Sequence, residues 1–336
     1  MTGALDEHVI DSVALRGNPL ADPHERPLWV YTPPGYSGGP VVYVLQGFTG
    51  RLEMWRNRAP FRPTFFELLD RKDVDARVVF VDAFTSVGGS QFVDSDGSGR
   101  YHTYICDEIV PFVDSRYDSN GLRGVAGKSS GGQGAAVTAM LRPDLFQGFA
   151  SHAGGGLFEV SIRPFFRVAA RRLRDAYEGS IERFLEELRS GPAPLAHPDD
   201  LHILLQWGFA AAYSADADGA IRLPYDIDTA QVIPELWERW LEWDYPTLVP
   251  RYADALRDLR AIYVDAGTRD EWYLDLTAEW LRRELSALPV RDLHAELFDA
   301  THLAIEYRYP IGLRYLADRL RQTLKRMFRT SPSWTS

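Results

Sequence analysis

Residues 127–132 read G-K-S-S-G-G, and this stretch decides which fold the chain can adopt. Two adjacent serines among glycines fit a phosphate-binding loop, a serine nucleophile on a sharp turn, or a flexible link. The phosphate-binding motif G-x-x-x-x-G-K-[ST] requires a glycine five positions before Gly127, and that position is Leu122. Residues 122–127, L-R-G-V-A-G, also resemble a strand, whereas a phosphate loop begins after its strand. The phosphate-binding interpretation is therefore excluded.

The nucleophile interpretation requires G-x-S-x-G at a turn between a strand and a helix, with small residues two positions before and after the serine. Gly127, Ser129 and Gly131 satisfy this spacing. If Ser130 were the nucleophile, Lys128 would occupy a position that needs a very small side chain. The residues that follow, G-Q-G-A-A-V-T-A-M-L, are typical of a helix. The sequence therefore predicts a nucleophile elbow with Ser129 at its tip.

Short apolar runs rich in β-branched residues alternate with helical patterns on both sides of the elbow. The predicted strands lie at 41–48, 77–84, 122–127, 148–154 and 261–267. Strands that alternate with helices form crossover units. The sequence therefore predicts an α/β fold with a mostly parallel sheet flanked by helices.

The alternation stops between residues 158 and 248, where no convincing strand is found. Apolar residues instead recur at helical spacing in I-E-R-F-L-E-E-L, L-H-I-L-L-Q-W and P-E-L-W-E-R-W-L-E-W. We predict a core of residues 1–157 and 249–336, with 158–248 as a helical insertion. Because the insertion leaves the sheet at the carboxyl end of a strand, where ligands bind on open parallel sheets, we expect it to cap the site.

A serine hydroxyl needs a base to accept its proton and an acid to orient that base. With a nucleophile elbow, the usual order along the chain is serine, then an acid after a later strand, then a histidine near the end. His302, in the loop-like sequence L-F-D-A-T-H-L, is the predicted base. Asp270, in the loop after the strand at 261–267, is the predicted acid. Asp265 inside that strand and Glu271 are the alternatives.

Stabilising the oxyanion of an acyl-transfer reaction requires two backbone N–H donors. One donor comes from the residue after the nucleophile, which is Ser130. The other comes from the loop after an early strand. The strand V-V-Y-V-L-Q-G-F is such an early strand, and the backbone amide of Phe48, which follows Gly47 at its end, is the predicted second donor.

The composition of the 336 residues, 45% hydrophobic and 25% charged, is that of an ordinary globular protein. The net charge of −10 argues against nucleic acid, whose binding depends on basic side chains. The sequence contains neither an apolar run of about 20 residues nor a secretory signal pattern, so we expect no membrane association and a cytoplasmic location. The single cysteine, Cys106, cannot form an internal disulfide, and its setting predicts a buried helix face.

Several motifs together resemble one known family, the putative-esterase family of α/β-hydrolases. They are Y-V-L-Q-G-F-T-G (43–50), M-W-R-N-R (54–58), G-V-A-G-K-S-S-G-G-Q-G-A (124–135), F-A-S-H-A-G-G (149–155), V-D-A-G-T-R-D-E-W-Y-L (264–274) and L-F-D-A-T-H-L-A-I-E-Y-R-Y (297–309), with Y-I-C-D-E-I-V-P-F-V-D-S-R-Y between the second and the third. The group is similar to enterochelin esterases, S-formylglutathione hydrolases and feruloyl esterases. Many relatives have His or Leu before the serine, where this chain has Lys128.

The resemblance implies the α/β-hydrolase fold and a serine carboxylesterase that uses Ser129, Asp270 and His302, with no metal and no cofactor. Water then resolves an acyl-enzyme formed on the serine. Gln46, Trp55 and His152 are the predicted contacts to a small-molecule ester. Acyl transfer to an alcohol is the alternative reaction. A catalytically silent binding protein on the same scaffold is the alternative outside enzymes, and assembly into a homo-oligomer stays open.

Overall fold

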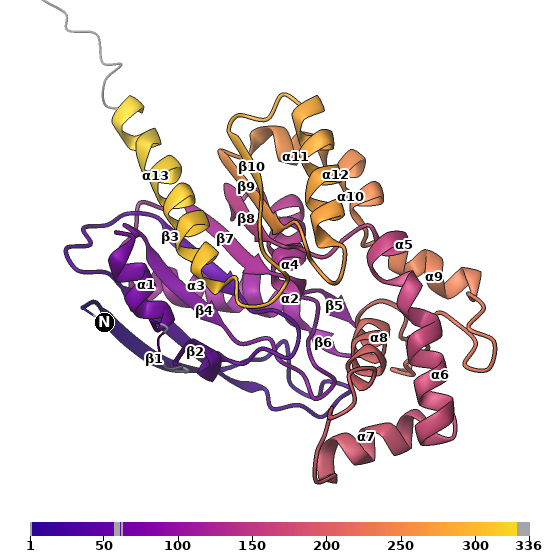
Figure 1. The fold of residues 1–336 in the computed structure, drawn as a ribbon. Helices are drawn as coiled ribbons and strands as arrows, with labels where there is room; N and C mark the ends of the chain where they lie inside the picture. The colour runs from indigo at the N-terminus through magenta and orange to yellow at the C-terminus, as the bar shows by residue number, and fades with distance from the viewer. Residues whose placement is uncertain (1, 57–60, 62, 328–336) are drawn as a thin grey trace, which may run out of the picture.

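The computed structural model describes residues 2–56, 61 and 63–327, and within them an eight-stranded sheet has the order β1-β2-β4-β3-β7-β8-β9-β10 (Figure 1). All pairings from β4 to β10 are parallel, whereas β1 and β2 join one edge in antiparallel orientation. The prediction of a mostly parallel sheet is confirmed. The strands are β1 (Ala4–Asp11), β2 (Glu25–Thr32), β3 (Val41–Leu45), β4 (Arg77–Val81), β7 (Arg123–Lys128), β8 (Gly148–His152), β9 (Ala261–Gly267) and β10 (Leu293–Phe298), with β5 (Asp94–Ser95) and β6 (Gly99–Arg100) as a separate ribbon.

Helices cover both faces of the sheet, so each central strand is buried on two sides. One face packs against α2 (Tyr101–Thr103), the π-helix η2 (Tyr104–Ile109), α3 (Val110–Arg116), α4 (Ser130–Leu141), α10 (Tyr245–Arg251), α11 (Ala253–Asp258) and α12 (Leu274–Ala287). The other face packs against α1 (Phe65–Arg71) and α13 (Tyr309–Met327). Short 3-10 turns lie at η1 (Leu52–Arg56), η3 (Arg163–Phe165) and η4 (Glu306–Arg308).

The strand β3 shows why this sheet needs two helical layers. All five of its residues are buried. Val41, Tyr43 and Leu45 belong to the core on the α4 side, and Val42 and Val44 belong to the core on the α13 side. A strand that is apolar at every position is typical of a parallel sheet covered on both faces. The apolar sequence of β3 therefore predicts that this strand lies at the centre of the molecule.

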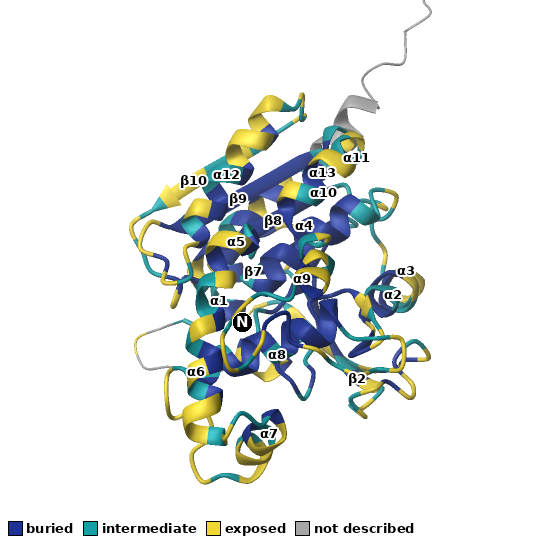
Figure 2. Cartoon of the chain, turned by 90° about the vertical axis from the view of Figure 1, so that its right-hand side faces the viewer, coloured by how far each residue is buried: buried dark blue, intermediate teal, exposed yellow. Residues whose placement is uncertain are grey.

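A helical segment of residues 158–241 lies between β8 and β9 and has an apolar core of its own. Its helices are α5 (Phe158–Ser161), η3, α6 (Phe166–Tyr177), α7 (Ile181–Ser190), α8 (Asp200–Tyr213) and α9 (Pro234–Leu241). Figure 1 shows α6, α7 and α8 grouped beyond the sheet, away from α13. In Figure 2, β9 and α4 lie in the buried centre, whereas α6 and α7 present exposed outer surfaces.

The two ends of the helical segment meet at one buried carboxylate. Asp244 accepts a hydrogen bond from the backbone amide of Phe158 at 2.7 Å, and it also caps α10 through the amide of Tyr245 at 2.8 Å. Burial raises the pKa of Asp244 to about 6. The chain therefore leaves the core and returns to it at the same place.

Candidate active site

Ser129 lies at a sharp turn between β7 and α4. Its backbone has φ 58° and ψ −125°, a conformation that is strained for any residue with a side chain. The flanking glycines are required by close contacts. A Cβ on Gly127 would lie 2.1 Å from the carbonyl oxygen of Gly131, and a Cβ on Gly131 would lie 2.3 Å from the carbonyl oxygen of Leu45. Both positions therefore require glycine because backbone atoms occupy the space that a side chain would fill.

Three backbone hydrogen bonds hold the strained turn in place. The amide of Ser129 donates to the carbonyl of His152 at 3.0 Å, which ties the turn to the end of β8. The carbonyl of Ser129 accepts from the amides of Gln133 at 3.0 Å and Gly155 at 3.1 Å. Because the backbone is fixed on both sides, the Ser129 side chain is presented in one direction at the carboxyl edge of the sheet.

His302 and Asp270 are brought together in the loops that follow β10 and β9. His302 Nδ1 lies 2.7 Å from Asp270 Oδ2, and the Asp270 side chain is fully buried. The second oxygen of Asp270 accepts the amide of Trp272 at 2.9 Å, so the carboxylate is held within its own turn. The backbone amide of His302 donates to Glu271 Oε2 at 2.8 Å. Both the ring and the backbone of His302 are thus positioned by the loop after β9.

Asp265, the alternative acid, lies elsewhere. Its Oδ1 pairs with His152 Nδ1 at 2.7 Å, and its Oδ2 accepts from Arg308 Nε at 2.8 Å and from the hydroxyl of Tyr263 at 3.0 Å. Burial opposes ionisation of this carboxyl, but its contacts with His152 and Arg308 outweigh burial and hold the pKa of Asp265 below its usual value. Asp265 is therefore a partner of His152 and not of His302.

A cavity of about 530 Å³ opens at this edge of the sheet, and both Ser129 and His302 line it. The described residues contain no hydrogen bond between the Ser129 hydroxyl and the His302 ring, a contact that in many enzymes forms only with substrate bound. The rest of the lining is Gly47, Phe48, Thr49, Gly50, Arg51, Met54, Lys128, Ser130, Gly155, Ser161, Ile162, Leu201, Leu205, Phe209, Trp272, Leu274, Leu303, Glu306 and Tyr309.

The two predicted oxyanion donors also line this cavity. Ser130 is the first residue of α4, where a backbone amide has no partner within the helix. Phe48 lies in the turn after β3, and its amide has no hydrogen-bond acceptor in the described part of the chain. The turn is fixed by the amide of Thr49, which donates to Gly88 at 2.7 Å. The ring of Phe48 packs edge-on against Phe209 of α8, with 6.1 Å between centroids.

The three predicted substrate contacts are buried and do not line the cavity that contains Ser129 and His302. His152 is fully buried under α13, with its ring packed against Tyr309, so its side chain is outside the cavity. Trp55 packs in the core against Phe65 with 4.5 Å between ring centroids. Gln46 is also buried. With its amide oriented to satisfy both groups, it donates to the carbonyl of Val81 and accepts from the amide of Ala83 at 3.0 Å. In the structure these three side chains pack within the core near the strand ends.

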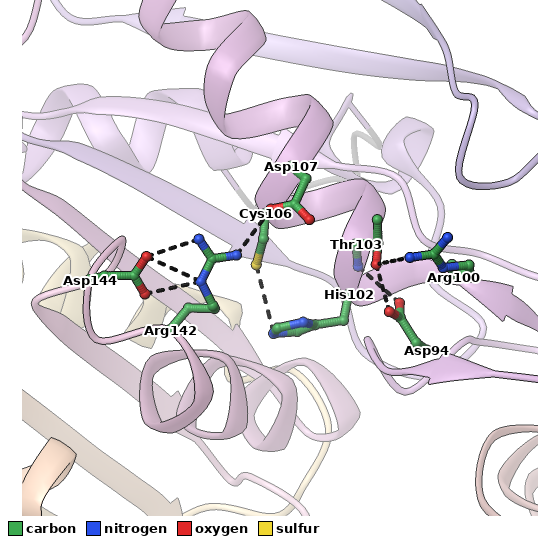
Figure 3. Close-up of polar contacts among 8 residues, drawn as sticks. All are labelled: Asp94, Arg100, His102, Thr103, Cys106, Asp107, Arg142 and Asp144. Atoms are coloured by element: carbon green, nitrogen blue, oxygen red, sulfur yellow. Dashed lines mark hydrogen bonds and ion pairs between the residues drawn. The ribbon is translucent and has the colours of Figure 1, made fainter.

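Cys106 is a core residue, as the sequence predicts, and Figure 3 shows its thiol beside the ring of His102. The distance between Sγ and His102 Nε2 is 3.7 Å. Burial raises the pKa of the Cys106 thiol to about 12 and lowers the pKa of His102, so neither group is charged near neutral pH. This pair therefore lacks the thiolate that a nucleophilic cysteine requires.

Other residues of the cavity belong to the segment that the sequence predicts to cap the site, but the sequence does not show which of its side chains face the cavity. Ile162, Leu201, Leu205 and Phe209 come from the helical segment, and their helical spacing is the signal that marks them as apolar but not as ligand-facing. Over residues 2–56, 61 and 63–327, no group of three or more His, Cys, Asp or Glu side chains is arranged to hold a metal ion. No helix in the same residues has both the length and the apolar character needed to cross a membrane.

Comparison with known proteins connects this geometry to a family. The model described as "Esterase: Putative esterase" matches residues 22–302, which confirms the resemblance carried by the motifs, although Asn57 and Arg58 of one motif lie outside the described residues. No curated protein matches the sequence.

Similar solved structures span nearly the whole chain. An S-formylglutathione hydrolase from Agrobacterium tumefaciens has 16% identity and a TM-score of 0.56, covering 95% of this chain and 96% of its own. A ferulic acid esterase has 16% identity and a TM-score of 0.54, with 95% and 99% covered. An S-formylglutathione hydrolase from Staphylococcus aureus has 12% identity and a TM-score of 0.52, with 94% and 99% covered. At these identities the likeness shows a shared fold.

Proposed function

This chain belongs to the putative esterase family of carboxylic ester hydrolases and has the α/β-hydrolase fold, and from this premise we propose that it hydrolyses its ester through an acyl-enzyme on Ser129. His302 is the base and Asp270 the acid that orients it. The observation that carries the proposal is that the strained serine and the Asp270-bound imidazole line one cavity.

The first half of the reaction forms the acyl-enzyme. Ser129 Oγ attacks the ester carbonyl carbon while His302 Nε2 accepts the hydroxyl proton. The carbonyl oxygen becomes an oxyanion, which accepts hydrogen bonds from the amides of Phe48 and Ser130. The bond between the carbonyl carbon and the leaving oxygen then breaks, and His302 returns its proton to the alcohol. Asp270 stabilises the imidazolium that exists between these steps.

The second half releases the acid. Water takes the place of the alcohol and loses a proton to His302 as it attacks the acyl carbon. Collapse of the second tetrahedral intermediate breaks the bond to Ser129 Oγ, which recovers its proton from His302. Since the 2.7 Å contact to Asp270 uses Nδ1, Nε2 is the ring nitrogen left free to face the cavity, as both halves require.

We also propose that the helical segment selects the substrate. Its contribution to the cavity lining is one hydroxyl, from Ser161, and the apolar side chains of Ile162, Leu201, Leu205 and Phe209. The segment also touches the loop of the acid, because Trp272 packs against Phe165 with 5.2 Å between ring centroids and against His202 at 5.0 Å. Apolar surface at the cavity favours bulky acyl or alcohol groups over small polar ones.

A fluorophosphonate probe tests the proposal, because it forms a stable bond only with an activated serine. We expect one adduct per chain, mapped to Ser129 by peptide mass spectrometry, and parallel loss of hydrolysis of p-nitrophenyl esters. Ser129→Ala should abolish both. Ser130→Ala is the matched control, since its contribution is a backbone amide that alanine keeps. Labelling of Ser130, or hydrolysis that survives in Ser129→Ala, would refute the assignment.

The same assay separates hydrolysis from the alternatives. Adding a primary alcohol to the reaction reveals acyl transfer if a new ester accumulates in place of the acid. We expect the acid as the main product, because the proposal gives water access to the acyl-enzyme. Absence of both labelling and turnover across short and long esters would favour a binding protein on this scaffold.

A further inference from the structure

Lys128 places a positive charge beside the nucleophile. It is the last residue of β7 and immediately precedes Ser129, and it lines the same cavity. Its side chain is only 12% exposed. A buried ammonium group carries three donors and is costly to desolvate unless it is paired. Its position therefore calls for a partner.

Glu306 is the acidic residue nearest to the Lys128 ammonium, but the contact between them is long. Lys128 Nζ lies 3.5 Å from Glu306 Oε1, too far for a strong hydrogen bond, and it donates no hydrogen bond to any described residue. Glu306 also lines the cavity and is 41% exposed, so water satisfies much of its charge. The ammonium of this cavity residue thus keeps hydrogen-bond donors that the described residues do not use.

The other charged group in the cavity lining is Arg51, and it is differently engaged. Its guanidinium lies over the ring of Phe84, with 4.4 Å to the centroid, and the residue is exposed. The lining therefore carries two cations and one anion, all from the core, while the helical segment adds apolar surface. Basic side chains therefore outnumber acidic ones in the cavity lining, although the whole chain has a net charge of −10.

We propose that the substrate is an ester that also carries a carboxylate, which binds Lys128 while an apolar part contacts the helical segment. This inference rests on the proposed function, since it names the substrate class for the same site. The carboxylate belongs either to the acid half, as in a monoester of a dicarboxylic acid, or to the alcohol half, as in an acylated hydroxybenzoate. Glu306 competes with the carboxylate for the ammonium and sets the strength of the preference.

The test compares esters that differ only in charge. For the acid half, the pair is the p-nitrophenyl monoester of adipic acid and the corresponding monoamide. For the alcohol half, it is p-carboxyphenyl acetate and p-carbamoylphenyl acetate. The measured quantity is the ratio of kcat/KM for the carboxylate to that for the carboxamide. The variants are Lys128→Met, which keeps an apolar side chain, Glu306→Gln, and Lys72→Met as a control at an exposed lysine outside the cavity.

We expect the wild-type ratio to exceed one in one of the two pairs. Lys128→Met should lower that ratio about 10- to 100-fold, the effect of losing one charge-assisted hydrogen bond. Glu306→Gln should raise it, and Lys72→Met should leave it unchanged. An unchanged ratio in Lys128→Met for both pairs overturns the inference, as does a ratio in Glu306→Gln at or below that of the wild type.

The second variant keeps the inference testable if Lys128→Met does not fold. Failure of the inference is also distinct from failure of the proposed function. If the carboxamide esters are hydrolysed in a Ser129-dependent manner but charge has no effect, only the substrate class is wrong. If no ester is hydrolysed and Ser129 is not labelled, the proposed function itself is wrong.

Discussion

Asp265 and His152 form a fully buried carboxylate–imidazole pair, with 2.7 Å between Oδ1 and Nδ1. The residue types and the distance are the same as in the pair formed by Asp270 and His302. The two pairs differ in what surrounds them. His302 faces the cavity, whereas the ring of His152 is closed off by Tyr309 and by Gly312 of α13. The same chemical pair is therefore enclosed beneath α13 in one place and adjoins the cavity in the other.

Replacing Asp270 by Asn should lower kcat by about 10⁴, because the amide no longer fixes the imidazole or stabilises its charged form. Stability should change little by comparison. The checks are steady-state kinetics on an activated ester and urea unfolding of the same preparation.

Asp265→Asn is the matched variant and should behave in the opposite way. It removes one of the two carboxylates that bind Arg308 and leaves the Glu296 contact at 2.6 Å, so we expect a cost of about 1.5–3 kcal/mol in unfolding free energy, the scale of one hydrogen bond to a charged group. If Asp265→Asn is stable but inactive while Asp270→Asn is active, then Asp265 and not Asp270 is the acid of the site.

Glu271 should act as a positioning residue for His302, because its carboxylate accepts the backbone amide of that histidine at 2.8 Å. We expect Glu271→Ala to lower kcat about 10-fold with little change in KM, the scale of one lost hydrogen bond to a charged group. Glu271→Gln retains an acceptor oxygen and should recover most of the rate. Equal losses in both variants would mean that the charge of Glu271, and not its hydrogen bond, is what the site needs.

Gly127→Ala should destabilise the fold by about 3 kcal/mol, because the new methyl group meets the backbone of Gly131 and not a side chain that could turn away. Gly89→Ala is the control, since its nearest neighbour, in Phe48, would be at an ordinary 3.4 Å. Thermal unfolding of the two variants measures the difference. Similar melting temperatures would show that the turn at Ser129 can relax.

Asp244 should make stability depend on pH in an unusual direction. Burial raises its pKa from 3.8 to about 6, so the folded protein holds the proton more tightly than the unfolded chain does. Its contribution is full below pH 3.8 and is lost as the pH rises through 6. Relative to Asp244→Asn, the unfolding free energy of the wild type should fall by about 2 kcal/mol between pH 4 and pH 7. Parallel profiles for the two proteins, measured by urea unfolding, would contradict this.

The central strands could be predicted from the sequence because burial on both faces leaves an apolar run that has no other interpretation. The first two strands were missed. β1 is an edge strand with the exposed acids Asp6 and Glu7, and β2 contains Pro27, a residue that argues against a strand. Pro27 is tolerated because the pairing with β4 begins one residue later, at Leu28. A local sequence pattern does not reveal where a ladder begins.

The backbone of the elbow could also be predicted, because its glycines are required by contacts within a few residues or with the next strand. The side chains around the cavity could not. Lys128 and His152 are register partners on neighbouring strands, yet one lines the cavity and the other lies beneath α13. Which one is covered depends on a helix about 150 residues further along the chain, and no spacing rule encodes that contact.

The hydrogen bond from the amide of Phe158 to Asp244 joins the two ends of the helical segment. Because the helical segment leaves the core and returns to it at this one contact, its length can change without moving the strands of the sheet. The hydrogen bonds that hold Ser129 and His302 come from residues outside the helical segment. Exchanging the helices at this junction should therefore change the apolar part of the cavity lining while the hydrogen bonds at Ser129 and His302 stay in place.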